Sequence, residues 1–212
     1  EFTHAVTDFT SQLFYYAQSG AINESMSDVW GEFVDLTNGY GTDTSGVRWL
    51  IGEDLSIGVL RSMSNPPDYS QPDKMTSSYY YRGLSDNAGV HYNNGVGNKA
   101  AYLLTDGGSF NGYTVTALGL AKTAALIYEV QSKYLVSGSD FQDYGDALYF
   151  ACRNMIGRTP YNSTIITNSD CQQVYNATHA VEMEKPAKNL GLEADEPYCD
   201  NGVTTPVDVL FN

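Results

Sequence analysis

Two short segments of this 212-residue sequence place carboxylates near histidines at spacings that suit chemistry. Glu1 and His4 stand three residues apart, so on a helix their side chains share one face. Asp86 and His91 lie in a segment rich in Asn and Gly, which is typical of a loop. A carboxylate and an imidazole can transfer protons or bind a metal ion. Each pair alone is weak evidence, because a lone histidine more often has no catalytic role.

Four segments taken together carry a specific resemblance. They are Glu1-Phe2-Thr3-His4-Ala5-Val6-Thr7-Asp8, Gly20 to Asp28, Leu60 to Ser64, and Asp86 to Gly95. In this order and at these spacings they resemble the thermolysin family of zinc peptidases. The resemblance is strong from Glu1 to about Tyr102 and rests mainly on helical pattern from there to Met183. It does not cover the residues after Pro186.

The resemblance implies a catalytic zinc site. In this family the ligands are two histidines of a His-Glu-x-x-His motif and a glutamate from a second helix. His4 matches the second histidine, Glu24 the glutamate ligand, and Glu1 the general base that deprotonates the zinc-bound water. The first histidine is expected immediately before Glu1, outside this sequence. The alternative for Glu24 is a solvated helix face, which its apolar neighbours disfavour.

The resemblance also implies donors for the oxyanion that develops during peptide hydrolysis. His91 and Tyr15 match these donors, and Asp86 matches the carboxylate that orients His91 and favours its protonated form. His91 could instead be an ordinary loop histidine. Tyr15 is one of 17 tyrosines, so its role depends on its match just before Gly20.

Three further polar residues match supporting positions of the family. Asp28 lies four residues after Glu24 and is implied to hold the histidine that precedes Glu1. Asn23 is implied to do the same for His4. Arg61 is implied to bind a backbone carbonyl of the substrate and to brace Glu24.

Substrate preference in this family comes from a hydrophobic pocket for the residue after the scissile bond. Ile51, Leu55 and Leu60 match positions on one side of that pocket. Because all three are apolar, we expect a preference for a large aliphatic or aromatic residue. The alternative is that they are ordinary core residues.

Calcium is a second metal that the resemblance suggests. Glu32, Asp35 and Glu53 match acidic positions near the third-ligand helix, and hard oxygen ligands suit calcium. Leu50 could add its backbone carbonyl. Arg48 stands where the family usually has an acid, which counts against the site.

The elements that position these residues are mainly helices. Residues 1–16 are compatible with a helix that runs to Gly20, and 21–36 repeat apolar residues at helical spacing. Residues 37–94 contain many turn signals and are expected to form loops and short strands. Four later helices are predicted at about 95–106, 116–135, 140–156 and 169–183. Ser139 or Asp140 would cap the third of these, and Ser169 or Asp170 the fourth.

The predicted fold class is therefore mainly α: the C-terminal helical-bundle lobe of a two-lobed metallopeptidase. Residues 1–185 would form this lobe, and residues 186–212 a linker or partly ordered extension. By resemblance, its partner is an N-terminal β-rich lobe of the same enzyme, with the active site in the cleft between them.

Three cysteines, Cys152, Cys171 and Cys199, indicate one disulfide and one thiol whose partner lies elsewhere. Cys152 and Cys171 are the preferred pair, because they would bridge a short loop between two predicted helices. Three reduced, buried thiols are the alternative.

Composition narrows the class of protein. Apolar residues make up 42% and charged residues 17%, as in a globular protein. The net charge of −14 and only eleven scattered Lys and Arg argue against nucleic-acid binding, and no apolar run is long enough for a membrane span. Composition thus leaves a globular protein, and the resemblance implies a secreted, extracellular zinc endopeptidase acting on proteins or peptides. This chain alone, with two of three zinc ligands, is expected to be inactive. The competing hypothesis is a secreted binding module that has lost catalysis.

Overall fold

The computed structural model describes residues 1–186, most of which are helical. In chain order the elements are α1 (Phe2–Phe9), α2 (Ala17–Asn38), β1 (Leu50–Ile51), β2 (Arg61–Ser62), the 3-10 helix η1 (Pro66–Tyr69), α3 (Ser85–Asn93), α4 (Gly95–Asp106), β3 (Gly108–Phe110), β4 (Tyr113–Val115), α5 (Leu120–Lys133), α6 (Phe141–Met155), η2 (Pro160–Asn162) and α7 (Asn168–Ala180). The strands form two small antiparallel sheets, β1 with β2 and β3 with β4. The predicted mainly α fold is confirmed.

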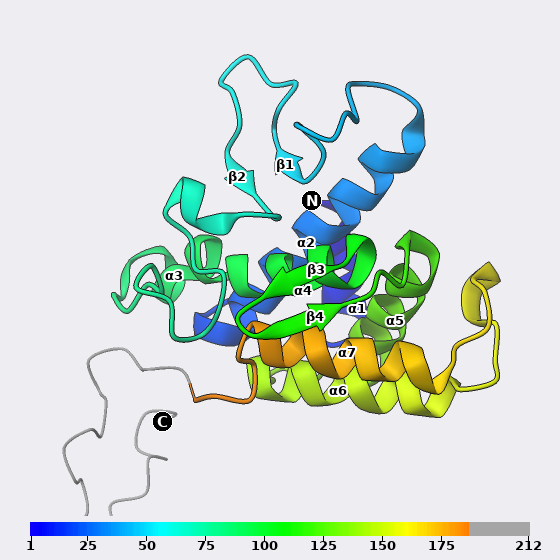
Figure 1. Ribbon diagram of the computed structural model, residues 1–212. Helices are drawn as coiled ribbons and strands as arrows, with labels where there is room; N and C mark the ends of the chain where they lie inside the picture. The colour runs from blue at the N-terminus through cyan, green and yellow to red at the C-terminus, as the bar shows by residue number, and fades with distance from the viewer. Residues whose placement is uncertain (187–212) are drawn as a thin grey trace, which may run out of the picture.

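The core of the lobe is built around α2. Ile22, Met26, Val29 and Phe33 recur at helical spacing along one side of α2 and are buried. The helices α1, α3, α4 and α5 all pack against α2 (Figure 1). Gly97 permits the close crossing of α4, because a Cβ atom at this position would lie 2.3 Å from the Ser25 hydroxyl oxygen.

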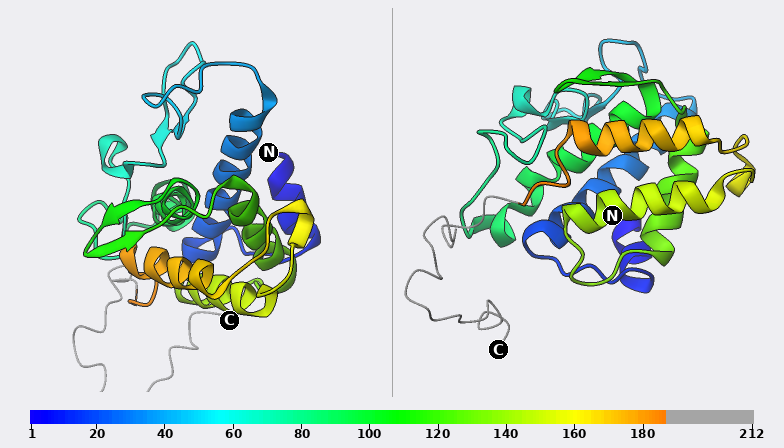
Figure 2. Two further views of the ribbon diagram at one scale, coloured as in Figure 1. Left: turned by 45° about the vertical axis from the view of Figure 1, so that its right-hand side comes forward. Right: turned by 60° about the horizontal axis from the view of Figure 1, so that its bottom comes forward.

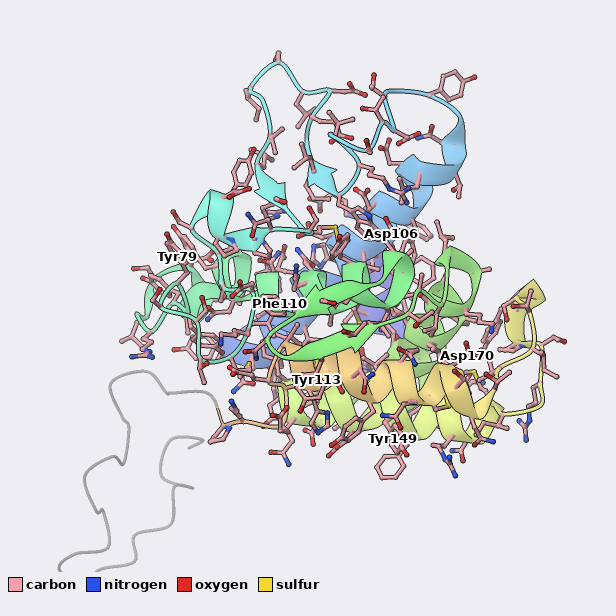
Figure 3. All side chains as sticks on the ribbon, in the orientation of Figure 1. Tyr79, Asp106, Phe110, Tyr113, Tyr149 and Asp170 are labelled. Atoms are coloured by element: carbon pink, nitrogen blue, oxygen red, sulfur yellow. A yellow bond between two sulfur atoms is a disulfide. The ribbon has the colours of Figure 1, made fainter. Side chains whose placement is uncertain are left out.

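Two antiparallel helices, α6 and α7, lie side by side along the lower edge of the lobe (Figures 1 and 2). Cys152 of α6 and Cys171 of α7 form a disulfide, which is the pairing expected from the sequence. Asp170 (Figure 3) accepts hydrogen bonds from Lys122 of α5 at 2.8 and 3.0 Å. These links join α7 to α6 and to α5.

The first predicted helix is wrong in its second half. α1 ends at Phe9, and the chain turns before α2 starts at Ala17, with positive φ at Gln12 and Ala17. The amide of Phe14 donates to the carbonyl of Ser137, 123 residues later in the chain, at 2.8 Å. This long-range contact holds residues 10–16 in a turn that the local sequence does not signal.

Other helix limits also differ from the predictions. α5 starts at Leu120 and not at residue 116, because the backbone N–H groups of Leu118 and Gly119 donate to the carbonyls of Leu104 and Thr105 and Gly119 has φ of 79°. The cap of α7 is Thr167, which forms a capping box with Asp170 in place of the predicted Ser169 or Asp170 cap. Asp140 caps α6 as predicted. The irregular region contains the α-helix α3 and the 3-10 helix η1, neither of which was expected.

The structure contains no helix among residues 1–186 that is long and apolar enough to cross a bilayer. The predicted C-terminal extension and Cys199 lie outside the described residues.

Candidate active site

His4 of α1 and Glu24 of α2 face each other across the junction of the two helices. His4 Nε2 lies 3.4 Å from Glu24 Oε1. His4 Nδ1 lies 2.7 Å from Asn23 Oδ1 and 3.3 Å from Ser27 Oγ. When the ring proton of His4 is on Nδ1, it is donated to Asn23. The lone pair of Nε2 then lies on the side of the ring that faces Glu24. The structure thus places Asn23 where the sequence suggested, and adds Ser27.

These two side chains fit a zinc site in part. Imidazole nitrogen and carboxylate oxygen are zinc donors, and Glu24 is a 4%-exposed carboxylate whose nearest cationic candidates are the histidines His4 and His91. Within residues 1–186, no three His, Cys, Asp or Glu side chains come together in a metal-ligating group. The chain therefore supplies two donors that suit zinc, while a third would have to come from elsewhere.

Tyr15 and His91 meet at the same carboxylate. The Tyr15 hydroxyl donates to Glu24 Oε1 and lies 3.2 Å from His91 Nε2. His91 Nε2 is 3.4 Å from Glu24 Oε2. Burial, together with the hydrogen bond and negative charge of Glu24, raises the pKa of Tyr15. Tyr15 therefore stays protonated at neutral pH and can donate a hydrogen bond.

Asp86 holds His91 through an unusual turn at the start of α3. Four consecutive residues, Asp86 to Gly89, have φ between 49° and 83° and ψ between 34° and 45°, which is left-handed helical backbone. This turn folds Asp86 back, so that its Oδ1 lies 2.6 Å from His91 Nδ1 and its Oδ2 accepts the His91 amide at 2.8 Å. L-residues adopt such a turn at a cost, so tertiary contacts must hold it.

Those contacts come from both sides of the turn. Asn93 accepts a hydrogen bond from the Tyr81 amide at 2.8 Å and donates to the Tyr81 carbonyl at 3.0 Å. Gly89 has no room for a side chain, because a Cβ atom would lie 2.6 Å from Tyr81 Cδ1. Gly20 similarly lets α2 approach the turn, since its Cβ atom would lie 2.5 Å from Val90 Cγ1. Two glycines thus allow Glu24 and His91 to meet.

Arg61 of β2 forms its ion pair with Asp28, at 2.8 Å. Asn94 and Asn98 donate to the other oxygen of Asp28 at 2.7 and 2.8 Å. Burial raises the pKa of Asp28, and the charge of Arg61 opposes that rise. The expected contact between Arg61 and Glu24 is absent from the described part of the chain, because the guanidinium pairs with Asp28.

A cavity of about 630 Å³ joins these groups. Its lining residues are Glu1, His4, Asp8, Leu13, Tyr15, Asn23, Glu24, Arg61 and His91. Seven of these were singled out from the sequence. Asp8 and Leu13 were not, although Asp8 lies one helical turn after His4 and could have been found from that spacing.

The pocket residues predicted from the sequence gather at the β1–β2 hairpin. Leu55 and Leu60 flank Gly52, and the Leu60 amide donates to the Ile51 carbonyl at 2.8 Å. Leu55 and Leu60 are 52% and 45% exposed, so they are not core residues, whereas Ile51 packs partly against the core. None of the three lines the cavity itself.

The acidic residues suggested for calcium influence one another's pKa, but within residues 1–186 they do not form a group of three that could hold a metal ion. Burial and the nearby Glu53 and Asp35 raise the pKa of Glu32 to about 7, although its carboxylate accepts the Trp49 amide at 2.7 Å. Burial, with the charges of Asp35 and Asp54, raises the pKa of Glu53. Arg48 is turned to Asp106 (Figure 3), with 3.1 Å between Nη2 and Oδ1.

The fold is that of a mainly helical lobe, and comparison with known proteins identifies its family. The family model described as "Thermolysin metallopeptidase, alpha-helical domain" matches residues 11–181, so the chain belongs to this family. It is 46% identical over 187 residues to a zinc metalloproteinase of Renibacterium salmoninarum, covering 85% of this chain and 33% of that protein. It is 40% identical over 182 residues to a thermolysin of Alicyclobacillus acidocaldarius, covering 84% of this chain and 31% of that protein.

A solved structure has the same fold. The precursor of protealysin, a metalloproteinase from Serratia proteamaculans, superposes with a TM-score of 0.62 at 27% identity, covering 85% of this chain and 54% of that one. The chain spans about a third of the length of the relatives it matches by sequence.

Proposed function

We propose that the full-length protein is a zinc-dependent endopeptidase that hydrolyses internal peptide bonds of extracellular proteins. The observation that carries this proposal is the convergence of Glu1, His4, Glu24, Tyr15 and His91 on one cavity. The disulfide between α6 and α7 supports a location outside the reducing cytosol.

Zinc would be held by His4 Nε2, by Glu24, and by a histidine directly before Glu1 in the full-length protein. Once bound, zinc supplies Lewis acidity to the water and the scissile carbonyl. Glu1 takes the proton of the attacking water and passes it to the leaving nitrogen. The Tyr15 hydroxyl and His91 Nε2 donate hydrogen bonds to the oxyanion, and Arg61 binds a carbonyl of the substrate backbone.

A large apolar residue after the scissile bond is the proposed preference. Leu55 and Leu60 support it, because they are exposed apolar side chains on the hairpin that also carries Arg61. A variant with Leu60→Ser should raise KM for substrates with Leu or Phe at this position more than for substrates with Ala.

The proposed partner of this lobe is an N-terminal β-rich lobe of the same enzyme. Phe2 and Phe9, at the two ends of α1, are 84% and 90% exposed. Single apolar side chains this exposed are common. Two of them on the helix that carries His4 support the proposal that the other lobe covers this surface beside the cleft.

A metal and activity assay tests the proposal. The purified full-length protein should contain one zinc ion and cleave casein, and 1,10-phenanthroline should abolish cleavage. Glu1→Gln should retain zinc and lose activity, whereas Asp43→Asn, an exposed loop variant, should change neither. The 212-residue chain alone should be inactive. A full-length protein with no zinc and no chelator-sensitive cleavage would instead favour a non-catalytic binding module.

A further inference from the structure

Gln71 is a buried amide that touches the backbone of His91. Gln71 is only 3% exposed and lies just after η1, in the irregular region. Nε2 donates to the His91 carbonyl at 2.6 Å and to Asn94 Oδ1 at 2.9 Å. Oε1 is buried and accepts no hydrogen bond from the described residues. The orientation of the amide is therefore set by the two acceptors that face its nitrogen.

Asn94 extends this contact into the ion pair of Arg61. Asn94 is fully buried, and its Nδ2 donates to Asp28 Oδ2 at 2.7 Å. The other oxygen of Asp28 accepts from Arg61 at 2.8 Å. An uninterrupted chain of hydrogen bonds thus runs from the His91 backbone through Gln71, Asn94 and Asp28 to the guanidinium of Arg61.

The local packing brings Gln71 to this position. The backbone N–H of Gln71 donates to the Pro66 carbonyl at 3.1 Å, and this hydrogen bond closes the turn after η1. Gly95, the first residue of α4, would place a Cβ atom 2.4 Å from the Pro72 carbonyl oxygen and 3.1 Å from Gln71 Cβ. Only glycine lets the 71–72 segment come this close to α4, and any larger residue would push Gln71 away from His91.

We propose that Gln71 and Asn94 are positioning residues that fix His91 relative to Arg61. They keep constant the distance between His91, which donates to the oxyanion, and the Arg61 guanidinium, which binds the substrate carbonyl. Neither residue lines the cavity, so both act through the residues that do. The inference rests on the proposed function, because His91 and Arg61 are assigned their roles there.

The two ends of the chain of hydrogen bonds predict different kinetic effects. A donor to the oxyanion acts in the transition state, so a displaced His91 lowers kcat and leaves KM nearly unchanged. A displaced Arg61 loses a contact that substrate already makes in the ground state, so KM rises. Loss of Gln71 should affect His91 first, because it contacts His91 directly. Loss of Asn98, which touches Asp28 but not Gln71 or His91, should raise KM first.

The experiment uses the full-length enzyme and a peptide substrate, at a temperature well below every Tm. Gln71→Met keeps the length of the side chain and removes the donor. We expect kcat to fall roughly 10- to 100-fold with KM within about twofold, since small misplacements of a catalytic group cost this much. Asn94→Ala is the second variant, with the same expected loss, in case Gln71→Met does not fold.

A matched control separates positioning from stability. Thr178 of α7 is also a buried polar residue, and its hydroxyl donates to the Tyr175 carbonyl, away from the cavity. Thr178→Ala should lower Tm and leave kcat unchanged. The decisive comparison is the double variant: in a His91→Ala background, Gln71→Met should cause no further loss of kcat.

An equal loss of kcat from Gln71→Met with and without His91 overturns the inference, as does an unchanged kcat in the single variant. Failure of the proposed function has a separate signature, because the unmodified enzyme would then show no zinc-dependent cleavage. In that case the inference falls with it.

Discussion

Asp86 holds His91 at two points with one carboxylate. Oδ1 lies 2.6 Å from the ring nitrogen Nδ1, and Oδ2 accepts the backbone N–H of the same residue at 2.8 Å. Backbone and ring are thereby fixed together, and the opposite ring nitrogen, Nε2, is directed to the cavity beside Tyr15 and Glu24.

Asp86→Asn should therefore impair catalysis without removing the metal. The amide matches the carboxylate in shape but cannot accept two hydrogen bonds through negatively charged oxygens. We expect kcat to fall roughly 10- to 100-fold, in line with other residues that orient a catalytic group, with zinc content and Tm close to those of the unmodified enzyme. Steady-state kinetics and metal analysis check this. An unchanged kcat would show that His91 does not depend on Asp86.

Asn87 offers a clean test of the left-handed turn, because its side chain is exposed and its φ is 49°. Asn tolerates this conformation better than Ala, and Gly tolerates it best. Asn87→Ala should lower the free energy of unfolding by about 1 kcal/mol, whereas Asn87→Gly should change it by less than about 0.5 kcal/mol. At Gln142, exposed in the right-handed α6, the order should be reversed, with Gly costing more than Ala. Thermal unfolding of both pairs makes the comparison, and the same order at both sites would contradict a left-handed turn.

The lowered pKa of Glu182 predicts how the stability of the protein depends on pH. It is 4% exposed, and burial raises its pKa, but hydrogen bonds from Lys185, Thr76 and Asn111 outweigh burial and lower the pKa from 4.5 to about 2. A carboxylate with a lowered folded-state pKa stabilises above the unfolded pKa and loses that contribution as the pH falls through the folded one. The protein should therefore lose up to about 3 kcal/mol between pH 4.5 and 2 through this group.

Glu182→Gln should abolish this part of the acid dependence and lower stability at pH 7. Asp146→Asn removes an exposed carboxylate of α6 instead and should leave the curve as it is. Denaturant unfolding across this pH range gives the answer. If the free energy of unfolding of both variants changes with pH as it does in the unmodified protein, Glu182 does not stabilise the fold through its charge.

Calcium at Glu32, Asp35 and Glu53 is proposed from the resemblance and would require these carboxylates to rearrange, because within residues 1–186 they do not form a group that could hold a metal ion. Burial is the main cause of the raised pKa of Glu32, the charges of Glu53 and Asp35 add to it, and a bound calcium ion would oppose the rise. Calcium at a hundred times its Kd should stabilise the protein by about 2.7 kcal/mol, visible as a higher Tm that a chelator reverses. Glu53→Gln should remove the effect, while Asp43→Asn should not. A Tm that does not respond to calcium would contradict a calcium site at these carboxylates.

The sequence predicted most of the helices and the main cavity residues for different reasons. Apolar residues at helical spacing in α2 and α4 to α7 are a local signal, and the structure agrees. Glu24, His4 and His91 were found through their resemblance to a known family, since nothing in their spacing requires residues 4 and 91 to meet. The structure brings them together through the turn at Asp86 to Gly89 and the close approach at Gly20.

What the sequence missed depends on contacts between distant residues. The turn after α1 is fixed by a bond from Phe14 to Ser137, and Gln71 gains its place through Gly95. An isolated glutamine in an irregular segment has no period to reveal it. Asn94 and Asn98 could have been noticed, because two amides four residues apart on an otherwise apolar helix indicate a buried polar partner.

The hydrogen bonds that hold α1 and the start of α2 determine when this part of the lobe can fold during synthesis. Gln131 donates to Thr7, Ser137 accepts from Phe14, and the Phe141 amide donates to Gln18. The segment with His4 and Tyr15 cannot be fixed until more than a hundred further residues have left the ribosome, and contacts this distant in sequence form slowly. Folding therefore fixes the residues that line the cavity late, after most of the lobe has been synthesised.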